Sequence, residues 1–456
     1  PKLFIWKETF NFSPCTIIMK RTAIILIATS AIMLTVASCT KAEYGSTNEV
    51  DTKSATNIST AKTSEFDVTP KDVEWYMKLR VIPARKDVQI KEIVPLTVDR
   101  EESHIYLVNM KDNKGWYLIA GDMRMDPVIA MYDDGNIDAG RLTTIASLWL
   151  SNINREISKV SKRAAKAEDK QSTSYAKWEC VRRMAELTAA TKADDDILSL
   201  EVIIDTISRV YYDPFTETSW TEGSPWNQLM PLTSSGSRVI VPSTALAIGQ
   251  YLYYMHYHGY GPSSSYENGT CTSLYTSQPY NYTFSNSTTS AWGKMSKVSG
   301  DENSNPNLSS FITSVLLGHI THSLGIKYVL PDYYSGTFSN TIVTYLAGLG
   351  VSTAAVTSEN YVNVELSNDR PVILSGVLSS NIHPYTCLID GRDSCRLQYI
   401  DIITYADGST SQNSYGDWTE TKLRINTGST PNKVWSNDYY FSFTDNSKVF
   451  FRLINQ

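Results

Sequence analysis

The sequence predicts an α+β protein with a smaller N-terminal unit and a larger C-terminal unit. Two strand-like runs, 105–110 and 116–120, flank a turn-rich segment at 111–115, and together they predict a β-hairpin. Apolar residues recur at roughly helical spacing through 142–157, which predicts a helix beside that hairpin. Segments of strong strand composition dominate the end of the chain, after an apolar helix that begins at residue 243. Helices and strands are therefore expected in both units.

The N-terminal unit is expected to span 65–160, because every strand and helix of its pattern lies between these residues. It adds a short amphipathic helix at 72–77 and a strand at 128–132 to the hairpin and the longer helix. Residues 39–64 are rich in Thr, Ser, Ala and Lys and predict a flexible tether. Residues 161–204 predict a helical connector, and the main domain is expected to run over 205–456.

The composition excludes several classes of protein. Of 456 residues, 42% are hydrophobic and 19% charged, which is enough apolar material to exclude wholesale disorder. Since 41 Lys and Arg stand against 47 Asp and Glu, with no basic stripe, no nucleic-acid partner is expected. Six cysteines are too few for a fold held together by disulfides.

The N-terminal segment predicts export and lipid anchoring. Residues 1–18 have no targeting pattern and are interpreted as translation upstream of a start at Met19. Residues 19–38 have a basic start and an apolar run too short to span a bilayer, as in a signal peptide. Small residues before Cys39 form a lipobox, so Cys39 is expected to carry two acyl chains, which give stable membrane attachment. The alternative is an ordinary signal peptide; the lipidated chain would lie in the cell envelope, in the outer membrane.

Several segments of the C-terminal unit, in matching order and spacing, resemble the streptopain family of papain-like cysteine peptidases. They are Trp-Thr-Glu-Gly-Ser-Pro-Trp-Asn at 220–227, the helix at 243–254, Arg-Pro-Val at 370–372, Ile-Asp-Gly at 389–391 and Arg-Ile-Asn at 424–426. The N-terminal unit resembles the propeptide of that family, also found as a protease-inhibitor (Spi) domain, through 115–122 and 126–135. The resemblance implies a papain-like domain preceded by an intramolecular pro-domain.

The resemblance places Ser243 at the position of the catalytic cysteine. A papain-like site needs a thiolate at a helix N-terminus, where the helix dipole and a neighbouring imidazolium lower the thiol pKa. A serine hydroxyl is far less ionised and needs a strong base beside it. The structural alternative is that Ser243 serves as a helix N-cap, a role that serine fills well.

The histidine position is occupied by Tyr385, and His383 lies two residues earlier. In a strand these two side chains share a face but lie about 6.6 Å apart along it. His383 can therefore stand in as the base only if the register slips, and Pro384 between them favours an irregular backbone.

The resemblance gives Asn426 the role of orienting the imidazole, and this residue type is retained. Thr427 follows it where the family has a shielding tryptophan. Glu222 stands where the family has a glutamine; if that residue helps to bind the oxyanion, an ionised carboxylate would oppose the developing charge.

Other histidines and cysteines predict ordinary packing. His319 and His322 share a helix face without a third ligand, so no metal or other cofactor is expected. Cys387 and Cys395 flank an expected turn at 391–393, and the alternatives for this pair are a local disulfide or two free thiols. Cys180 and Cys271 are interpreted as packed or free thiols. His256 and His258 lie two residues apart on the helix that begins at residue 243, so their side chains diverge.

The sequence therefore predicts a lipoprotein related to a streptopain-type zymogen that has lost its cysteine–histidine dyad. Its groove would bind a protein or peptide ligand, or regulate related peptidases. The alternative is an active cysteine- or serine-type peptidase, using Ser243 with His383 and Asn426 once the pro-domain is removed. A third hypothesis is a surface lipoprotein that only holds a partner.

Overall fold

The structure is a computed structural model of the chain. It describes residues 17–20, 64–82, 85, 88–97, 104–142, 144–193, 197–233, 235–262, 269–272, 279–282, 292–293, 295, 297, 306–326, 328–329, 333–334, 339–377, 384–428, 433–437 and 447–454. The predictions for Cys39, the tether and His383 lie outside these residues. Strand β1 (Ile17–Lys20), at the start of the expected signal peptide, pairs with β6 (Ile197–Tyr212).

The N-terminal unit is built on four antiparallel strands that follow one another in the sheet. They are β2 (Ile90–Pro95), β3 (Ile105–Met110), β4 (Trp116–Ala120) and β5 (Val128–Tyr132). The turn between β3 and β4 includes a short 3₁₀ segment, η3 (Lys111–Asn113), in which Asp112 and Asn113 have positive φ. The hairpin predicted for 105–120 is therefore confirmed, with both strands at their expected positions.

Helices cover both faces of these strands. Since side chains alternate along a strand, Leu107 and Leu118 point to one face, where α2 (Thr144–Lys162) packs through Trp149. Val108 and Ile119 point to the other face. That face is covered by α1 (Pro70–Tyr76), the π-helical turn η1 (Met77–Val81) and α3 (Thr173–Ala193). Short 3₁₀ turns, η4 (Ala139–Arg141) and η5 (Ala167–Gln171), precede α2 and α3.

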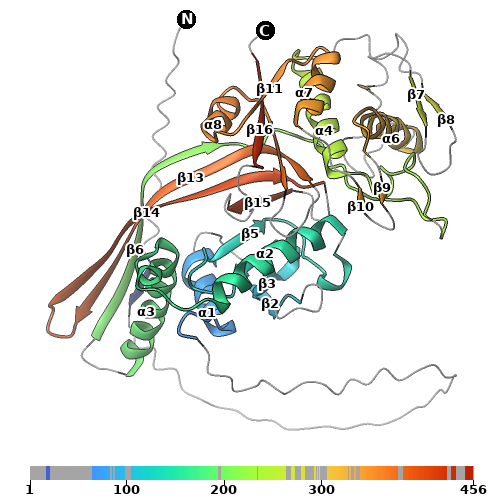
Figure 1. Cartoon of the computed structure of the whole chain (residues 1–456). Helices are drawn as coiled ribbons and strands as arrows, with labels where there is room; N and C mark the ends of the chain where they lie inside the picture. Colours follow the sequence, from blue (N-terminus) through green and yellow to red (C-terminus); the bar gives the residue numbers. More distant parts are fainter. Residues whose placement is uncertain are drawn as a thin grey trace, which may run out of the picture.

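The C-terminal unit has a helical half and a sheet half (Figure 1). Its helices are α4 (Ser243–Tyr257), α6 (Pro306–Ser323), α7 (Ser339–Gly348) and α8 (Asn360–Leu366). Thirteen residues of α4 are buried, so this helix lies at the centre of its core, against α6 and the sheet. Two small antiparallel pairs lie nearby: β7 (Gly269–Thr272) with β8 (Pro279–Tyr282), and β9 (Tyr328–Val329) with β10 (Tyr333–Tyr334).

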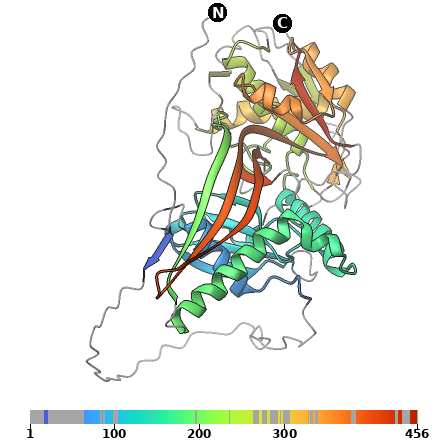
Figure 2. The same cartoon turned by 90° about the vertical axis from the view of Figure 1, so that its left-hand side faces the viewer.

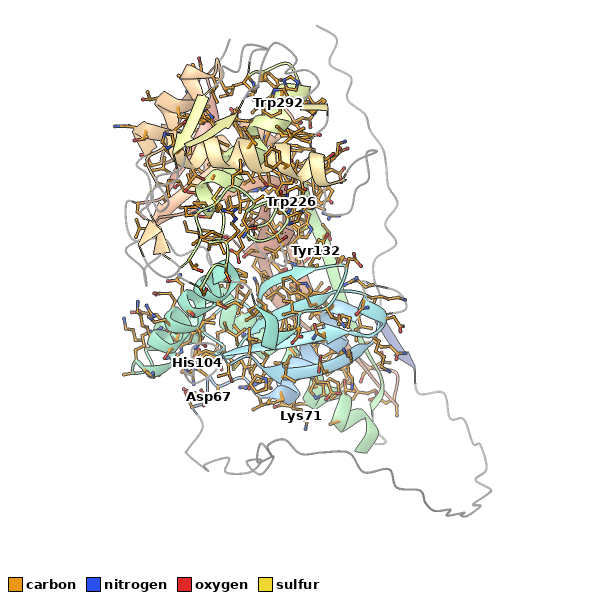
Figure 3. All side chains as sticks on the ribbon, turned by 90° about the vertical axis from the view of Figure 1, so that its right-hand side faces the viewer. Asp67, Lys71, His104, Tyr132, Trp226 and Trp292 are labelled. Carbon is orange, nitrogen blue, oxygen red and sulfur yellow. The ribbon has the colours of Figure 1, made fainter. Side chains whose placement is uncertain are left out.

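The two units share one antiparallel sheet. Its order is β11 (Thr353–Val356), β16 (Val449–Leu453), β12 (Val372–Val377), β13 (Pro384–Tyr405), β14 (Thr410–Asn426), β15 (Lys433–Asn437), then β5, β4, β3 and β2. The junction is the pairing of β15 with β5, where Trp435 lies opposite Met131 and Ser436 opposite Ala130. In Figure 3, Tyr132 of β5 lies where the units meet, with Trp226 and Trp292 in one unit and His104 in the other.

A long ribbon joins the units a second time. Strand β6 (Ile197–Tyr212) and β14 pair with β13 on opposite sides, and the three strands run down beside the N-terminal unit (Figure 2). Their residues Tyr399, Ile403 and Trp418 pack in the same apolar cluster as α1 and α3. The boundary expected between residues 204 and 205 lies inside strand β6. The last residues of the connector, which was expected to be helical, are therefore part of a strand that continues into the main domain.

The turn predicted at 391–393 is wrong, because these residues continue strand β13. Gly391 marks a register shift in the ladder, and a Cβ there would lie 2.9 Å from Cβ of Arg424 and 3.2 Å from the Tyr212 carbonyl oxygen. The glycine therefore permits close approach of three strands. Cys387 and Cys395 are free thiols eight residues apart on this strand, about 26 Å by extended-chain geometry, so the optional disulfide is not formed.

Candidate functional site

The first turn of α4 carries the residue expected at the nucleophile position. Ser243 is the first residue of the helix and is 1% exposed. The preceding Pro242 has extended backbone angles and is the N-cap residue, so the alternative role of Ser243 as the N-cap is wrong. The Ser243 Oγ accepts a hydrogen bond from the backbone N–H of Thr386, at 3.3 Å. The helix start is thereby bonded to strand β13.

Buried hydroxyls surround this contact. The Thr386 Oγ1 lies 2.9 Å from the Oγ1 of Thr244 and 2.9 Å from the Oγ of Ser375. The three side chains come from α4, β12 and β13. Sequence reasoning missed Thr244, Ser375 and Thr386; the available signal was that Thr386 directly follows the histidine position. Ser243 thus contacts the backbone amide of Thr386, and the hydroxyls of Thr244 and Ser375 meet the side chain of the same threonine.

Tyr385 lies next to Thr386 and therefore points to the opposite face of β13. Its side chain is 5% exposed, and its hydroxyl donates to the carbonyl oxygen of Thr427 at 3.4 Å. The ring belongs to the apolar cluster that continues into the N-terminal unit, together with Cys387 of β13 and Trp149 of α2. Tyr385 thus contributes to the core between the units.

Asn426 ends β14 and is 1% exposed. Its Nδ2 donates to the Thr218 carbonyl oxygen at 3.1 Å and to Oε1 of Gln250 at 2.5 Å, while its Oδ1 accepts from the Gly428 backbone N–H at 3.2 Å. Both hydrogens of the amide are therefore used to hold α4 and the segment before it. Among the described residues this side chain joins elements of the fold, and no bond to Tyr385 is seen.

Glu222 lies between the helix start and the end of β14. Its backbone N–H donates to the Gly428 carbonyl oxygen at 2.9 Å, and its own carbonyl accepts from the Val241 N–H at 2.8 Å. The side chain is buried, with 3% exposed. The backbone thus brings the segments of Glu222, Ser243 and Asn426 together.

Asp390, the motif residue after the histidine position, is fully buried and ion-paired. Its Oδ2 accepts from the backbone N–H of Thr216 at 3.1 Å and from Arg424, whose Nη1 lies 3.2 Å away. It also accepts from the Thr216 hydroxyl. A buried carboxylate with this many donors anchors β13 to the segment before α4.

The remaining histidines of the described chain lie away from this site. Burial, with a smaller contribution from His322, lowers the pKa of His319 to about 4, and its ring nitrogens meet the hydroxyls of Ser323 and Tyr345. His256 stacks on Trp292, with centroids 4.9 Å apart, and burial lowers its pKa.

Burial disfavours the thiolate form of three cysteines, Cys180, Cys387 and Cys395. Burial raises the pKa of Cys180 to about 12, and burial together with Asp393 raises that of Cys395 to about 12. Burial also raises the pKa of Cys387. Within the described ranges no cluster of three His, Cys, Asp or Glu side chains is arranged to hold a metal.

Comparison with known families matches both units. The model of the Peptidase C10 family matches residues 220–428, from Trp220 to Gly428, which includes Ser243 and Asn426. The Spi protease inhibitor model matches residues 84–157. The chain thus contains a Peptidase C10 (streptopain family) domain, with a Spi protease inhibitor domain ahead of it. The α+β class is confirmed by the helices and the large antiparallel sheet.

Individual proteins similar to this chain come from two bacteria. The Thiol protease/hemagglutinin PrtT of Porphyromonas gingivalis is 24% identical over 314 residues, which are 65% of this chain and 32% of that protein. The chain therefore spans about a third of that relative's length. A prointerpain A fragment of Prevotella intermedia covers 79% of this chain and 98% of its own, at 16% identity and a TM-score of 0.47. The match to active interpain A of the same species covers 53% of this chain and 94% of the interpain A chain, at 18% identity and a TM-score of 0.37.

Proposed function

We propose that this chain is a catalytically degenerate member of its family, which binds a protein or peptide, or regulates related peptidases, without hydrolysis. The observation that carries the proposal is the pair of substitutions at the dyad. A hydroxyl occupies the first turn of α4, and a buried tyrosine occupies the histidine position. Hydrolysis by this family's mechanism needs a thiolate and an imidazole that shuttles the proton.

The surroundings of both residues support this proposal. The Ser243 Oγ accepts a hydrogen bond from the Thr386 backbone N–H, and the side chain is 1% exposed, so it is held at the helix start and closed to solvent. Tyr385 is packed in the apolar cluster shared with the Spi domain, where its ring fills space. The retained Asn426 is bonded to Gln250 and Thr218, so its retention is explained by structure.

The proposal includes envelope attachment through Cys39 and removal of residues 1–38, with the tether, Spi domain, connector and peptidase domain divided as expected from the sequence. The described helices include none long and apolar enough to cross a bilayer. Labelling of cells with a radioactive fatty acid tests the anchor. We expect label on the chain and none on a Cys39→Ser variant; equal labelling of both contradicts the lipid attachment.

Hydrolysis of casein by the whole chain tests the loss of activity. The chain is assayed intact and after limited proteolysis in the exposed segment 164–168, beside a Ser243→Ala variant. We expect no turnover from any sample. Turnover that Ser243→Ala abolishes would overturn the proposal and establish the alternative, an active serine-type peptidase released by removal of its pro-domain.

A double substitution tests the descent from a peptidase. Ser243→Cys with Tyr385→His restores the residue types of the dyad. A gain of casein hydrolysis, absent from Ser243→Cys alone, would support the ancestry. Binding of fluorescent casein peptides to the unsubstituted chain, measured by anisotropy, tests whether the chain binds a peptide without cleaving it.

A further inference from the structure

A cavity of about 470 Å³ opens at the C-terminal end of α4, the end of the helix opposite to Ser243. Its walls come from the segment 215–218, the last turns of α4 and three further residues, Gly293, Met295 and Lys297. Trp292, labelled in Figure 3, immediately precedes this last wall. The cavity and Ser243 lie at opposite ends of a 15-residue helix, which is roughly 20 Å long. A ligand in the cavity therefore lies far from Ser243, although the Thr218 carbonyl in the cavity wall accepts a hydrogen bond from Asn426.

Aromatic rings form much of the wall. Phe215 and Tyr254 have ring centroids 5.2 Å apart, and Tyr253 and Tyr257 have centroids 4.9 Å apart. The imidazole of His258 stacks on Tyr254 at 3.9 Å, with an angle of 17° between the planes. Tyr257 is 52% exposed, which is unusual for a large ring and leaves much of its surface accessible.

An uncharged hydroxyl and a pair of charged side chains complete the wall of the cavity. The hydroxyl of Thr218 is buried in its wall, and among the residues that the structure describes it has no hydrogen-bond partner. Lys297 and Glu217 form an ion pair that is largely exposed and so offers both a donor and an acceptor at the rim. An unsatisfied buried hydroxyl is uncommon in folded proteins and points to a missing partner.

This combination selects one ligand chemistry. A cation would be opposed by Lys297 and an anion by Glu217, and an apolar ligand would leave Thr218 without a partner. A ring with apolar faces and several hydroxyls stacks on aromatic side chains and also uses donors and acceptors together. We propose that this cavity binds a neutral saccharide unit, which stacks on Tyr257 and bonds to Thr218 and the rim pair.

The test measures binding of methyl glycosides of glucose, galactose and N-acetylglucosamine to the whole chain by calorimetry and saturation-transfer NMR. Two further probes, N-acetyl-tyrosinamide and choline, represent an aromatic side chain and an organic cation. We expect at least one glycoside to bind, with affinity above that of both other probes. Failure of all three glycosides, or preference for either of the other probes, overturns the proposal.

Three variants locate the binding. Tyr257→Ala removes an exposed ring and is expected to weaken glycoside binding about tenfold. Thr218→Val keeps the shape and removes a hydroxyl that supports no bond in the described fold, so the chain should fold normally while binding falls about fivefold. Tyr211→Ala, at a tyrosine 42% exposed on β6, is the matched control and should leave affinity unchanged. Unchanged affinity in Tyr257→Ala, or equal loss in Tyr211→Ala, overturns the assignment to this cavity.

Discussion

Asn426 illustrates how a residue of a catalytic motif can serve the fold. Its amide donates to Gln250 and Thr218 and accepts from Gly428, all within a fully enclosed environment. Gln250 is seven residues after Ser243. In the comparison with the family pattern, this spacing served only to locate the nucleophile position. At the scale of single residues, the retained motif positions join α4 to β14.

Asn426→Ala should therefore reduce stability. The substitution leaves Gln250 Oε1, the Thr218 carbonyl and the Gly428 N–H without their partner in a dry site, so we expect a loss of about 3 kcal/mol in the free energy of unfolding. Urea unfolding measures it. The exposed Gln412 on the same strand is the control, because Gln412→Ala should cost no more than about 0.5 kcal/mol. Equal effects of both variants would show that the network contributes nothing.

At the scale of elements, the approach of α4 to the end of β14 depends on Gly428. Its φ is +69°, and a Cβ there would lie 2.7 Å from Cδ1 and 3.2 Å from Cβ of Leu246 on α4. Its carbonyl also receives the Glu222 N–H, so this turn holds both neighbouring segments. Only glycine meets the backbone angle and the contact without strain.

Gly428→Ala should cost about 2–4 kcal/mol, since it adds a steric clash to the strain of positive φ. Gly236 is the control for the strain of positive φ alone, because its φ is +82° and a Cβ there would meet nothing within 4 Å. Gly236→Ala should cost only about 1 kcal/mol. Thermal unfolding of both variants gives the comparison, and a smaller loss for Gly428→Ala would contradict the packing argument.

Local pattern predicts some elements well and others poorly. The strands at 105–110 and 116–120 were predictable because alternation, strand composition and turn chemistry agree there. The turn expected at 391–393 failed because Gly, Arg and Asp favour a turn locally, whereas pairing with β6 and β14 on both sides keeps β13 extended. Likewise, the hydroxyls of Ser375 and Thr386 that cluster with Thr244 come from strands distant in sequence from α4, so no spacing reveals this cluster.

At the scale of the whole molecule, the Spi and peptidase domains are joined by more than their connector. The sheet is continuous through β15 and β5, and the Ser436 hydroxyl donates to the Ile129 carbonyl oxygen at 3.0 Å across the junction. Two apolar clusters contain residues of both domains. A cut in the connector therefore removes none of the contacts between them.

Trypsin cleavage after the exposed Lys166 should consequently leave both fragments together. We expect the cleaved chain to elute as one species in size-exclusion chromatography and to separate only in denaturant. Separation of the fragments in native buffer would contradict a shared core.

The contact between the ribbon and the Spi domain should weaken in acid. Burial opposes ionisation of Glu420, but Lys177, Arg80 and Lys422 outweigh it and lower its pKa to about 2. Because the folded pKa lies below the unfolded one, this carboxylate stabilises the fold above about pH 4.5, and the contribution is lost as pH falls towards 2. Between pH 5 and pH 2, roughly, the unsubstituted chain should lose more stability than Glu420→Gln. Parallel pH profiles of the two would refute this role.

The most direct test of the lost activity is reaction of Ser243 with a fluorophosphonate, which forms a covalent ester with an activated serine as fluoride leaves. The chain is treated intact and after cleavage at Lys166, and labelling is measured by mass spectrometry of the peptide containing Ser243. Since Ser243 is 1% exposed and a buried tyrosine, Tyr385, stands at the histidine position, we predict no labelling of this peptide in either form. Stoichiometric labelling at Ser243, absent after denaturation, would contradict the proposal and identify a working serine nucleophile.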